Sequence, residues 1–259
     1  MKIPSTIAAI APDGRLTPAQ RRRFIIEMSL RRVKPGTGSG PEFLKRRTAM
    51  NPWPDLRPIL KDFPWAIAGV VATRAYMPER ATKNVDILVH RQNSEEILKR
   101  LQLAGYQLIS ELIVVPGFLL QSPDGVEVDV ILGDYPWLDE ALARPRRDPA
   151  GYPALDLPYL ILMKLEASRA QDLGDLSRML GLASEKDLER VRAAVIQYAP
   201  DMAEDLESLI YLGQLEMRPP AAEEWPFETD SILSSQPQDF NINFGGQTTC
   251  LIHFKLLTH

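Results

Sequence analysis

The segment at positions 82–90, TKNVDILVH, constrains the fold of this 259-residue chain more than any other feature. Its residues alternate with a period of two, which places the apolar positions 85, 87 and 89 on one face of a strand. Asn84 and Asp86 then share the opposite face with Leu88. The segment therefore predicts a strand with one apolar face and two neighbouring polar side chains on the other.

The segments around this strand predict a mixed sheet with helices packed on it. A short apolar run that ends at glycine, WAIAG, is typical of a buried strand. Pro123, Asp124 and Gly125 form a hairpin signal between two further apolar stretches. The expected strands are 65–69, 82–90, 117–121 and 126–132, and the expected helices among them are 54–61, 71–76 and 94–104.

Beyond Asp134 the apolar residues recur with helical spacing. The fold class is therefore predicted to be α+β, with a mixed sheet, flanking helices and a C-terminal helical bundle. The expected C-terminal helices are 136–143, 157–182 with Gly174 as the candidate break, 186–198 and 200–217. The expected domains are a basic N-terminal helix and linker (1–50), a core (51–134), a helical C-terminal region (135–218) and an irregular tail (219–259).

The composition excludes several classes of protein. Hydrophobic residues make up 45% and charged residues 25% of the chain, as in ordinary globular proteins. No apolar run approaches the roughly 20 residues that span a bilayer, so we expect a cytoplasmic protein without a membrane partner. Cys250 is the single cysteine, which excludes an intramolecular disulfide and a cysteine-based zinc cluster.

Charge is unevenly distributed along the chain. Residues 1–50 hold eleven Lys and Arg against three Asp and Glu, a net charge of +8, within a total of −4. The segment includes a predicted helix that Thr17 caps and that runs to about Val33. A basic arm on an acidic body indicates an anionic partner, such as RNA or an acidic protein. An amphipathic helix with a solvated basic face explains the same pattern equally well.

Carboxylates on neighbouring strands suggest phosphoryl or nucleotidyl transfer. This chemistry needs divalent cations between carboxylates and phosphate oxygens, together with donors that hold the triphosphate. Acids at positions i and i+2 of one strand, with a third acid on the next strand, supply such a site. Here Asn84 and Asp86 occupy the first strand, and Asp129 lies in the apolar strand after the hairpin turn.

Four segments carry a longer pattern of this kind. They are 65–72 (WAIAGVVA), 80–89 (RATKNVDILV), 125–131 (GVEVDVI) and 164–175, with Lys-Leu-Glu-Ala followed by two aspartates. In this order they resemble the strand-to-helix turn, the R-x-T-x-D-x-D strand, the third-acid strand and the helical K-L-x-A…D-x-x-D signature of the nucleotidyltransferase-fold superfamily. The similarity is greatest to its AbiEii-like toxin branch and extends over about residues 65–182.

The resemblance implies an enzyme that transfers a nucleoside monophosphate from a nucleoside triphosphate to a hydroxyl, on an RNA 3′ end or a protein. Asp86 and Asp129 would be catalytic, and with Asn84 they would bind Mg²⁺ or Mn²⁺. An antitoxin partner is implied by the toxin branch. The residues implied to bind substrate are Gly69, Val70, Arg80, Thr82, Lys164 and Arg169.

The chain departs from the family pattern at two positions. Asn84 stands in place of the first aspartate, and Val70 in place of a glycine or serine. Loss of one charge pair at about 4 Å and an effective dielectric near 20 is worth about 4 kcal/mol, or about three decades in rate. A protein of the same fold that binds nucleotide or a partner without catalysis is therefore the rival hypothesis, and a protein that binds nothing at this position is a third.

The candidate residues also have purely structural interpretations. Asp86 can be an acid at a strand end that pairs with Arg80. Arg80 and Thr82 can simply support a turn, and Lys164 and Arg169 can lie on the solvated face of a helix. The sequence alone leaves these alternatives open.

Overall fold

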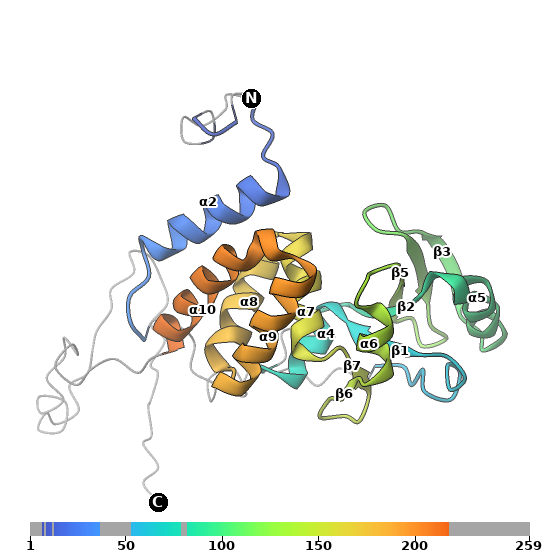
Figure 1. The fold of residues 1–259 in the computed structure, drawn as a ribbon. Coiled ribbons are helices and arrows are strands. Elements are labelled where there is room, and N and C mark those ends of the chain that lie inside the picture. Colours follow the sequence, from blue (N-terminus) through green and yellow to red (C-terminus); the bar gives the residue numbers. More distant parts are fainter. Residues whose placement is uncertain (1–6, 8, 12, 37–52, 79–81, 218–259) are drawn as a thin grey trace, which may run out of the picture. The chain divides into compact units, whose positions relative to one another are not determined.

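A seven-stranded mixed sheet runs through the described part of the chain, in the order β3-β4-β5-β2-β1-β7-β6 (Figure 1). The computed structural model describes residues 7, 9–11, 13–36, 53–78 and 82–217. The pairs β2–β5 and β1–β7 are parallel, and the other neighbours are antiparallel. The strands are β1 (Trp65–Ala68), β2 (Asn84–His90), β3 (Gln107–Glu111), β4 (Gly117–Gln121), β5 (Glu127–Gly133), β6 (Arg146–Arg147) and β7 (Pro153–Ala154).

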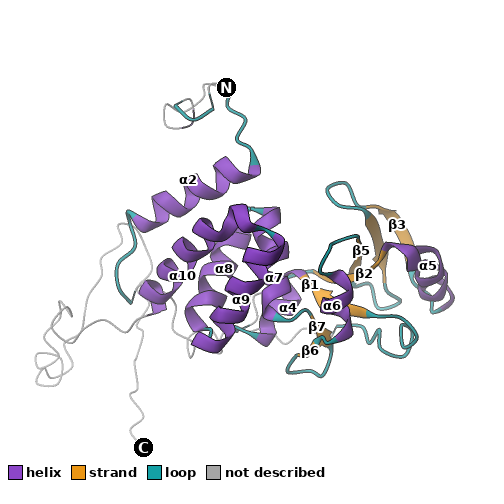
Figure 2. Ribbon diagram, in the orientation of Figure 1, coloured by secondary structure: helices purple, strands orange, loops and turns teal. Residues whose placement is uncertain are grey.

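Helices alternate with the strands along the chain as far as β7, and the described chain after β7 is helical (Figure 2). The predicted α+β class, a mixed sheet followed by a helical region, is confirmed. The α-helices are α2 (Pro18–Leu30), α4 (Gly69–Ala72), α5 (Ser94–Leu103), α6 (Leu138–Ala143), α7 (Leu157–Ala167), α8 (Ala170–Leu182), α9 (Glu185–Tyr198) and α10 (Ala203–Met217). Short 3-10 helices cover η1 (Thr73–Ala75), η2 (Arg91–Asn93) and η3 (Pro200–Met202).

Strand β2 lies at the centre of the sheet, and the predicted alternation explains its position. Val85, Ile87 and Val89 are at most 2% exposed. Leu88 on the opposite face is also fully buried, so the C-terminal end of β2 is covered on both faces. The polar face is therefore confined to the N-terminal half of β2, where Asn84 and Asp86 are only partly buried.

The long helix predicted at 157–182 is broken at Ser168, not at Gly174. Ser168 has φ of +49° and, among the described residues, is the one non-glycine with a positive φ. Its hydroxyl oxygen accepts a hydrogen bond from Nη1 of Arg22 at 2.9 Å, and its hydroxyl donates to the carbonyl of Leu165. Gly174 lies inside α8. A contact with a residue far away in sequence stabilises the break, which local helix signals do not reveal.

The helix predicted at 54–61 is absent: residues 54–56 are irregular, and turns and a bend cover residues 57–61. Pro58 has no N–H to donate and disfavours helical backbone at Arg57. The carboxylate of Asp55 instead accepts a hydrogen bond from the Arg57 N–H at 3.1 Å, which stabilises a turn. Strands β3, β6 and β7 were not predicted: β6 and β7 have two residues each, and every residue of β3 is exposed.

Helix α2 begins at the predicted cap, where Thr17 and Gln20 form a capping box. It packs against α8 and α10, and Arg22 in its first half is 2% exposed. The guanidinium of Arg22 pairs with Asp205 at 2.5 Å. At least one arginine of the basic N-terminal segment therefore serves the fold, whereas Arg23 beside it is exposed.

Residues 37–52 and the predicted irregular tail at 219–259 lie outside the described residues. Among the helices that are described, none is both long and apolar enough to cross a membrane.

Candidate active site

Asp86 and Asp129 lie directly opposite each other on the central strands of the sheet. Strands β2 and β5 run parallel, and their register pairs Asp86 with Asp129 and Asn84 with Glu127. Register partners on neighbouring strands are about 5 Å apart and project from the same face. The sheet therefore brings together the two carboxylates that the sequence predicted to be catalytic, although they are 43 positions apart in sequence.

The turn after β1 closes one side of this carboxylate pair. Ala68 pairs with Asp86 in the register of β1 and β2, and the chain turns into α4 at the next residue. Gly69 has φ of +58°, and a Cβ atom placed on it would lie 1.9 Å from Oδ2 of Asp86. Only glycine can occupy this position without displacing the carboxylate. The Val70 N–H donates a hydrogen bond to Asp86, so this backbone donor is already engaged by protein.

The environment makes ionisation of both carboxyl groups less favourable. Burial, and then the neighbouring Asp129 carboxylate, raise the pKa of Asp86 to about 6. Burial also raises the pKa of Asp129, against hydrogen bonds from Asn84 and Asp86 that lower it. Two carboxylates side by side with little water favour either a shared proton or a bound cation.

Asn84 presents its nitrogen, not its oxygen, to the carboxylate pair. Its Nδ2 donates to Oδ2 of Asp129 at 2.7 Å, and its Oδ1 accepts from the Thr82 hydroxyl at 3.0 Å. The sequence predicted that three side-chain oxygens converge, and the structure brings together those of Asp86 and Asp129 but not that of Asn84. The amide of Asn84 thus supplies a positive dipole where the family pattern has a negative charge.

The pair of carboxylates fits a magnesium ion, with a smaller ligand set than expected. Mg²⁺ is commonly held by only one or two protein carboxylates together with waters and phosphate oxygens, and Asp86 and Asp129 provide this number. Asn84 could join them only after its amide turned over, which would break its hydrogen bond to Asp129. Within the described ranges, no group of three or more His, Cys, Asp or Glu residues is placed to hold a metal.

Two cations from the helical region influence the same carboxylate. Both Arg169 and Lys164 lower the pKa of Asp86 through their charge. Lys164 is 3% exposed, and its Nζ lies 3.1 Å from Oδ1 of Asp172 and 2.9 Å from Oδ2 of Asp175. Arg169 pairs with Asp172 at 2.6 Å, but its side chain is 59% exposed. Arg169 is therefore available to an incoming anion, whereas Lys164 is held by two carboxylates.

Two other residues predicted to bind substrate are Thr82 and Arg80. Thr82 lies beside the site through its bond to Asn84. Arg80 lies outside the described residues. Asp172 and Asp175, which bind Lys164, are the two aspartates of the D-x-x-D part of the helical signature. Their pairing with Lys164 was not predicted, because it depends on the break between α7 and α8 at Ser168.

Comparisons with known proteins found similarity only at the level of three-dimensional structure. No family model and no curated protein sequence matches the chain. The antibiotic-resistance factor ANT(2'')-Ia in solution is 18% identical, with a TM-score of 0.34 over 60% of this chain and 83% of that chain. The same factor in complex with adenylyl-2''-tobramycin is 19% identical, with a TM-score of 0.32 over 60% of this chain and 88% of that chain.

A second kind of structure is similar to a lower degree. Terminal uridylyl transferase 4 from Trypanosoma brucei with bound GTP is 14% identical, with a TM-score of 0.24 over 68% of this chain and 49% of that chain. Similarities of this degree identify neither an activity nor a ligand of this chain.

Proposed function

We propose that the chain is a nucleotidyltransferase that moves a nucleoside monophosphate from a nucleoside triphosphate to a hydroxyl acceptor. The observation that carries the proposal is the pairing of Asp86 with Asp129 across two parallel strands, directly against the Gly69 turn. A purely structural acid would gain nothing from a partly buried like-charged neighbour, because burial and repulsion both oppose its ionisation. A nucleotidyltransferase needs this arrangement.

Asp86 and Asp129 would hold Mg²⁺ or Mn²⁺, which supplies charge neutralisation at the phosphates when bound. The acceptor oxygen forms a bond to the α-phosphorus, the bond from that phosphorus to the bridging oxygen breaks, and pyrophosphate leaves. Asp129 accepts the proton of the attacking hydroxyl, a role that its raised pKa favours. The substrate-binding roles of Gly69, Val70, Arg80, Thr82, Lys164 and Arg169 stay proposals, with Arg169 the best placed of the cations.

A specific observation favours a second candidate function. The Asn84 amide already donates to Asp129, and a donor at this position neutralises part of the charge that a cation would otherwise need to balance. A nucleotide-binding protein without catalysis is consistent with this contact. The resemblance to AbiEii-like toxins adds the proposals of a cytoplasmic location, an antitoxin partner, and an RNA 3′ end or a protein as acceptor.

The substitution Asn84→Asp distinguishes the two functions. It restores a carboxylate next to Asp129, so we expect transfer from a labelled nucleoside triphosphate in the presence of Mg²⁺ to rise by at least about tenfold. The control Asp139→Asn changes a carboxylate that is 97% exposed and should leave the rate unchanged.

Calorimetric titration with each nucleoside triphosphate, with and without Mg²⁺, completes the test. Metal-dependent binding with transfer that Asp86→Ala abolishes supports the enzyme. Binding without transfer, both in the native chain and after Asn84→Asp, supports the second function. If Asn84→Asp leaves a measurable native rate unchanged or lowers it, the metal site is not built from these residues.

A further inference from the structure

Three exposed arginines lie on and directly before the hairpin that β6 and β7 form. Arg144 ends α6, and Arg146 and Arg147 make up β6. All three are exposed, and none forms an ion pair with an Asp or Glu of the described residues. We call residues 144–154 the arginine hairpin. It is a concentration of positive charge on a chain whose net charge is −4.

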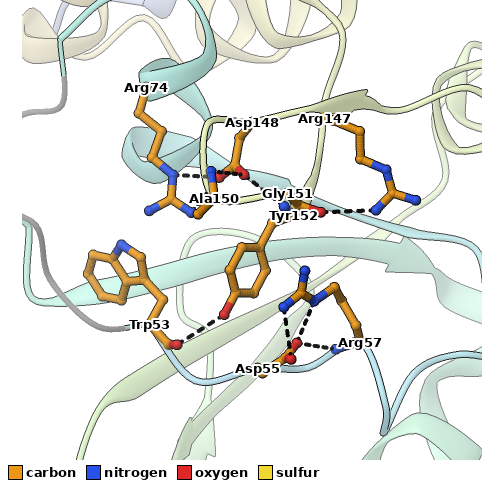
Figure 3. Close-up of polar contacts among 9 residues, drawn as sticks. All are labelled: Trp53, Asp55, Arg57, Arg74, Arg147, Asp148, Ala150, Gly151 and Tyr152. Carbon is orange, nitrogen blue, oxygen red and sulfur yellow. Dashed lines mark hydrogen bonds and ion pairs between the residues drawn. The ribbon is translucent and has the colours of Figure 1, made fainter.

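The arginine hairpin is held in place by buried and part-buried polar contacts, which Figure 3 shows. Oδ1 of Asp148 accepts hydrogen bonds from the N–H groups of Ala150 at 3.0 Å and Tyr152 at 2.7 Å. Its Oδ2 accepts from Nε of Arg74 at 2.5 Å. The Tyr152 hydroxyl donates to the Trp53 carbonyl at 3.1 Å. The exposed arginines therefore project from a fixed support and not from a loose loop.

Contacts within the protein orient the guanidinium groups of Arg146 and Arg147 but leave N–H groups available to a ligand. Nη1 of Arg147 donates to the Gly151 carbonyl at 3.0 Å, which leaves most of its N–H groups free for other acceptors (Figure 3). The guanidinium of Arg146 lies 5.3 Å from the centre of the Tyr76 ring, within cation–π range. Arg57 beside the hairpin pairs with Asp55, so this neighbouring pair adds little net charge. Oriented guanidinium forks that have no carboxylate partner in the described part of the chain suit phosphate groups.

The register of the sheet places these arginines level with the candidate active site. Arg146 pairs with Ala154, Ala154 with Ile67, and Ile67 with Ile87, which follows Asp86. Three strand spacings of about 4.8 Å separate β6 from β2, or roughly 14 Å. Because side chains alternate along a strand, Arg146 shares the face of Ile87, whereas Arg147 next to it shares the face of Asp86. A flexible chain bound at Arg147 can therefore place its end at the carboxylate pair, and Arg146 adds positive charge at the same edge of the sheet.

We propose that the arginine hairpin binds the phosphodiester backbone of a single-stranded nucleic acid whose terminal hydroxyl is the acceptor of the reaction. The role as acceptor rests on the proposed function, whereas the binding itself does not. A single strand fits better than a folded acidic protein, because the acceptor must bring a thin end to two partly buried carboxylates.

Fluorescence anisotropy with labelled single-stranded RNA tests the binding. The double variant Arg146→Gln/Arg147→Gln removes two charges from the hairpin. The matched control Arg91→Gln/Lys99→Gln removes two exposed charges from η2 and α5, away from the hairpin. Far-ultraviolet circular dichroism and the melting temperature verify that both variants are folded.

We expect the hairpin variant to bind RNA at least about tenfold more weakly, and the control to stay within about twofold of the native chain. Between about 50 and about 200 mM salt, the slope of log affinity against log salt should fall in magnitude by about 1.4, or about 0.7 for each lost phosphate contact. An equal loss in both variants, or an unchanged slope in the hairpin variant, would overturn the proposal. If polyglutamate binds as tightly as RNA and the hairpin variant loses this binding, the surface binds acidic proteins, and the proposal is also overturned.

Two further comparisons distinguish RNA from DNA as the ligand, and binding at the hairpin from nucleotide transfer to the bound strand. Single-stranded DNA of the same sequence shares the phosphodiester chemistry, so a preference for one of the two identifies the natural acceptor. Strands with a free or a phosphorylated 3′ hydroxyl should bind equally, and only the free hydroxyl should receive the nucleotide. Binding through the hairpin without transfer to either strand, in the native chain and after Asn84→Asp, would refute the acceptor role while the binding site stands. Transfer to a different hydroxyl in the same variant would still support the proposed function.

Discussion

Replacing Asp86 by Asn should stabilise the metal-free protein at neutral and alkaline pH. The pKa of Asp86 is raised to about 6 by burial and by Asp129, whereas an aspartate in an unfolded chain titrates near about 3.9. Between about pH 4 and pH 6 the folded chain therefore holds more protons at Asp86 than the unfolded chain. The free energy of unfolding falls as pH rises through this window, and the lost stability is not regained at higher pH.

The size of the effect follows from the difference between the two pKa values. About two pKa units correspond to about 3 kcal/mol of destabilisation once Asp86 is ionised. Asparagine has nearly the same shape, cannot ionise, and keeps an oxygen that can accept the hydrogen bond from the Val70 N–H. We therefore expect Asp86→Asn to exceed the native chain in stability by up to about 3 kcal/mol near pH 8, and by close to zero near pH 4.

Urea unfolding followed by circular dichroism measures both values, in EDTA and at a series of pH values between these limits. Asp139→Asn serves as the control, since its side chain is 97% exposed. Addition of Mg²⁺ at high pH should then stabilise the native chain and leave Asp86→Asn unchanged, because a ligand stabilises only the folded state that binds it. A variant that is less stable than the native chain near pH 8, or a difference that does not vary with pH, refutes the reasoning.

Two further substitutions test the turn beside the candidate site and the ion pair between α2 and α10, each against a matched control. Gly69→Ala should lose Mg²⁺-dependent stabilisation and melt at a lower temperature than Gly125→Ala. Both changes place a side chain at a positive φ, at a cost of about 1–2 kcal/mol, but only Gly69→Ala forces a Cβ to within 1.9 Å of Asp86. Equal melting temperatures would contradict this. Arg22→Met should lower the free energy of unfolding by up to about 3–5 kcal/mol, because it removes the buried partner of Asp205 and leaves that carboxylate only a longer ion pair with the exposed Arg23, at 3.7 Å. Arg23→Met removes only this longer, exposed contact and should cost less than about 1 kcal/mol in the same urea titration. Similar losses in the two arginine variants would mean that the buried ion pair is not formed.

The fold could be predicted where local pattern and tertiary environment agree. Strand β2 was predicted because its alternation matches a sheet with a packed face, and residues 85, 87 and 89 are indeed buried. The hairpin between β4 and β5 was predicted because Gly125 can adopt the positive φ that the turn requires. In both cases the deciding signal lies within a few residues of the element itself.

The predictions fail where a residue that is distant in sequence, or a single side chain in a turn, determines the local structure. Ser168 is not a residue that usually ends a helix, and its left-handed conformation is stabilised by the guanidinium of Arg22 across 146 positions. Strands β6 and β7 are too short to show alternation, and Asp148 in the turn between them makes the hairpin stable. Neither interaction leaves a periodic pattern in the sequence.

The site itself was predictable in its carboxylates but not in the orientation of Asn84. Sequence placed Asn84 and Asp86 on one face, and the parallel register added Asp129 opposite Asp86. Two contacts orient the Asn84 amide: the Thr82 hydroxyl donates to its oxygen, and the Asp129 carboxylate accepts from its nitrogen. An amide that faces a carboxylate lowers the pKa of that carboxylate, and so it partly offsets the burial that would make Asp129 a better proton acceptor. Under the proposed function, Asn84 would act against catalysis in two ways, by withholding a charge from the cation and by weakening the base, and both effects should be relieved together when an aspartate replaces it.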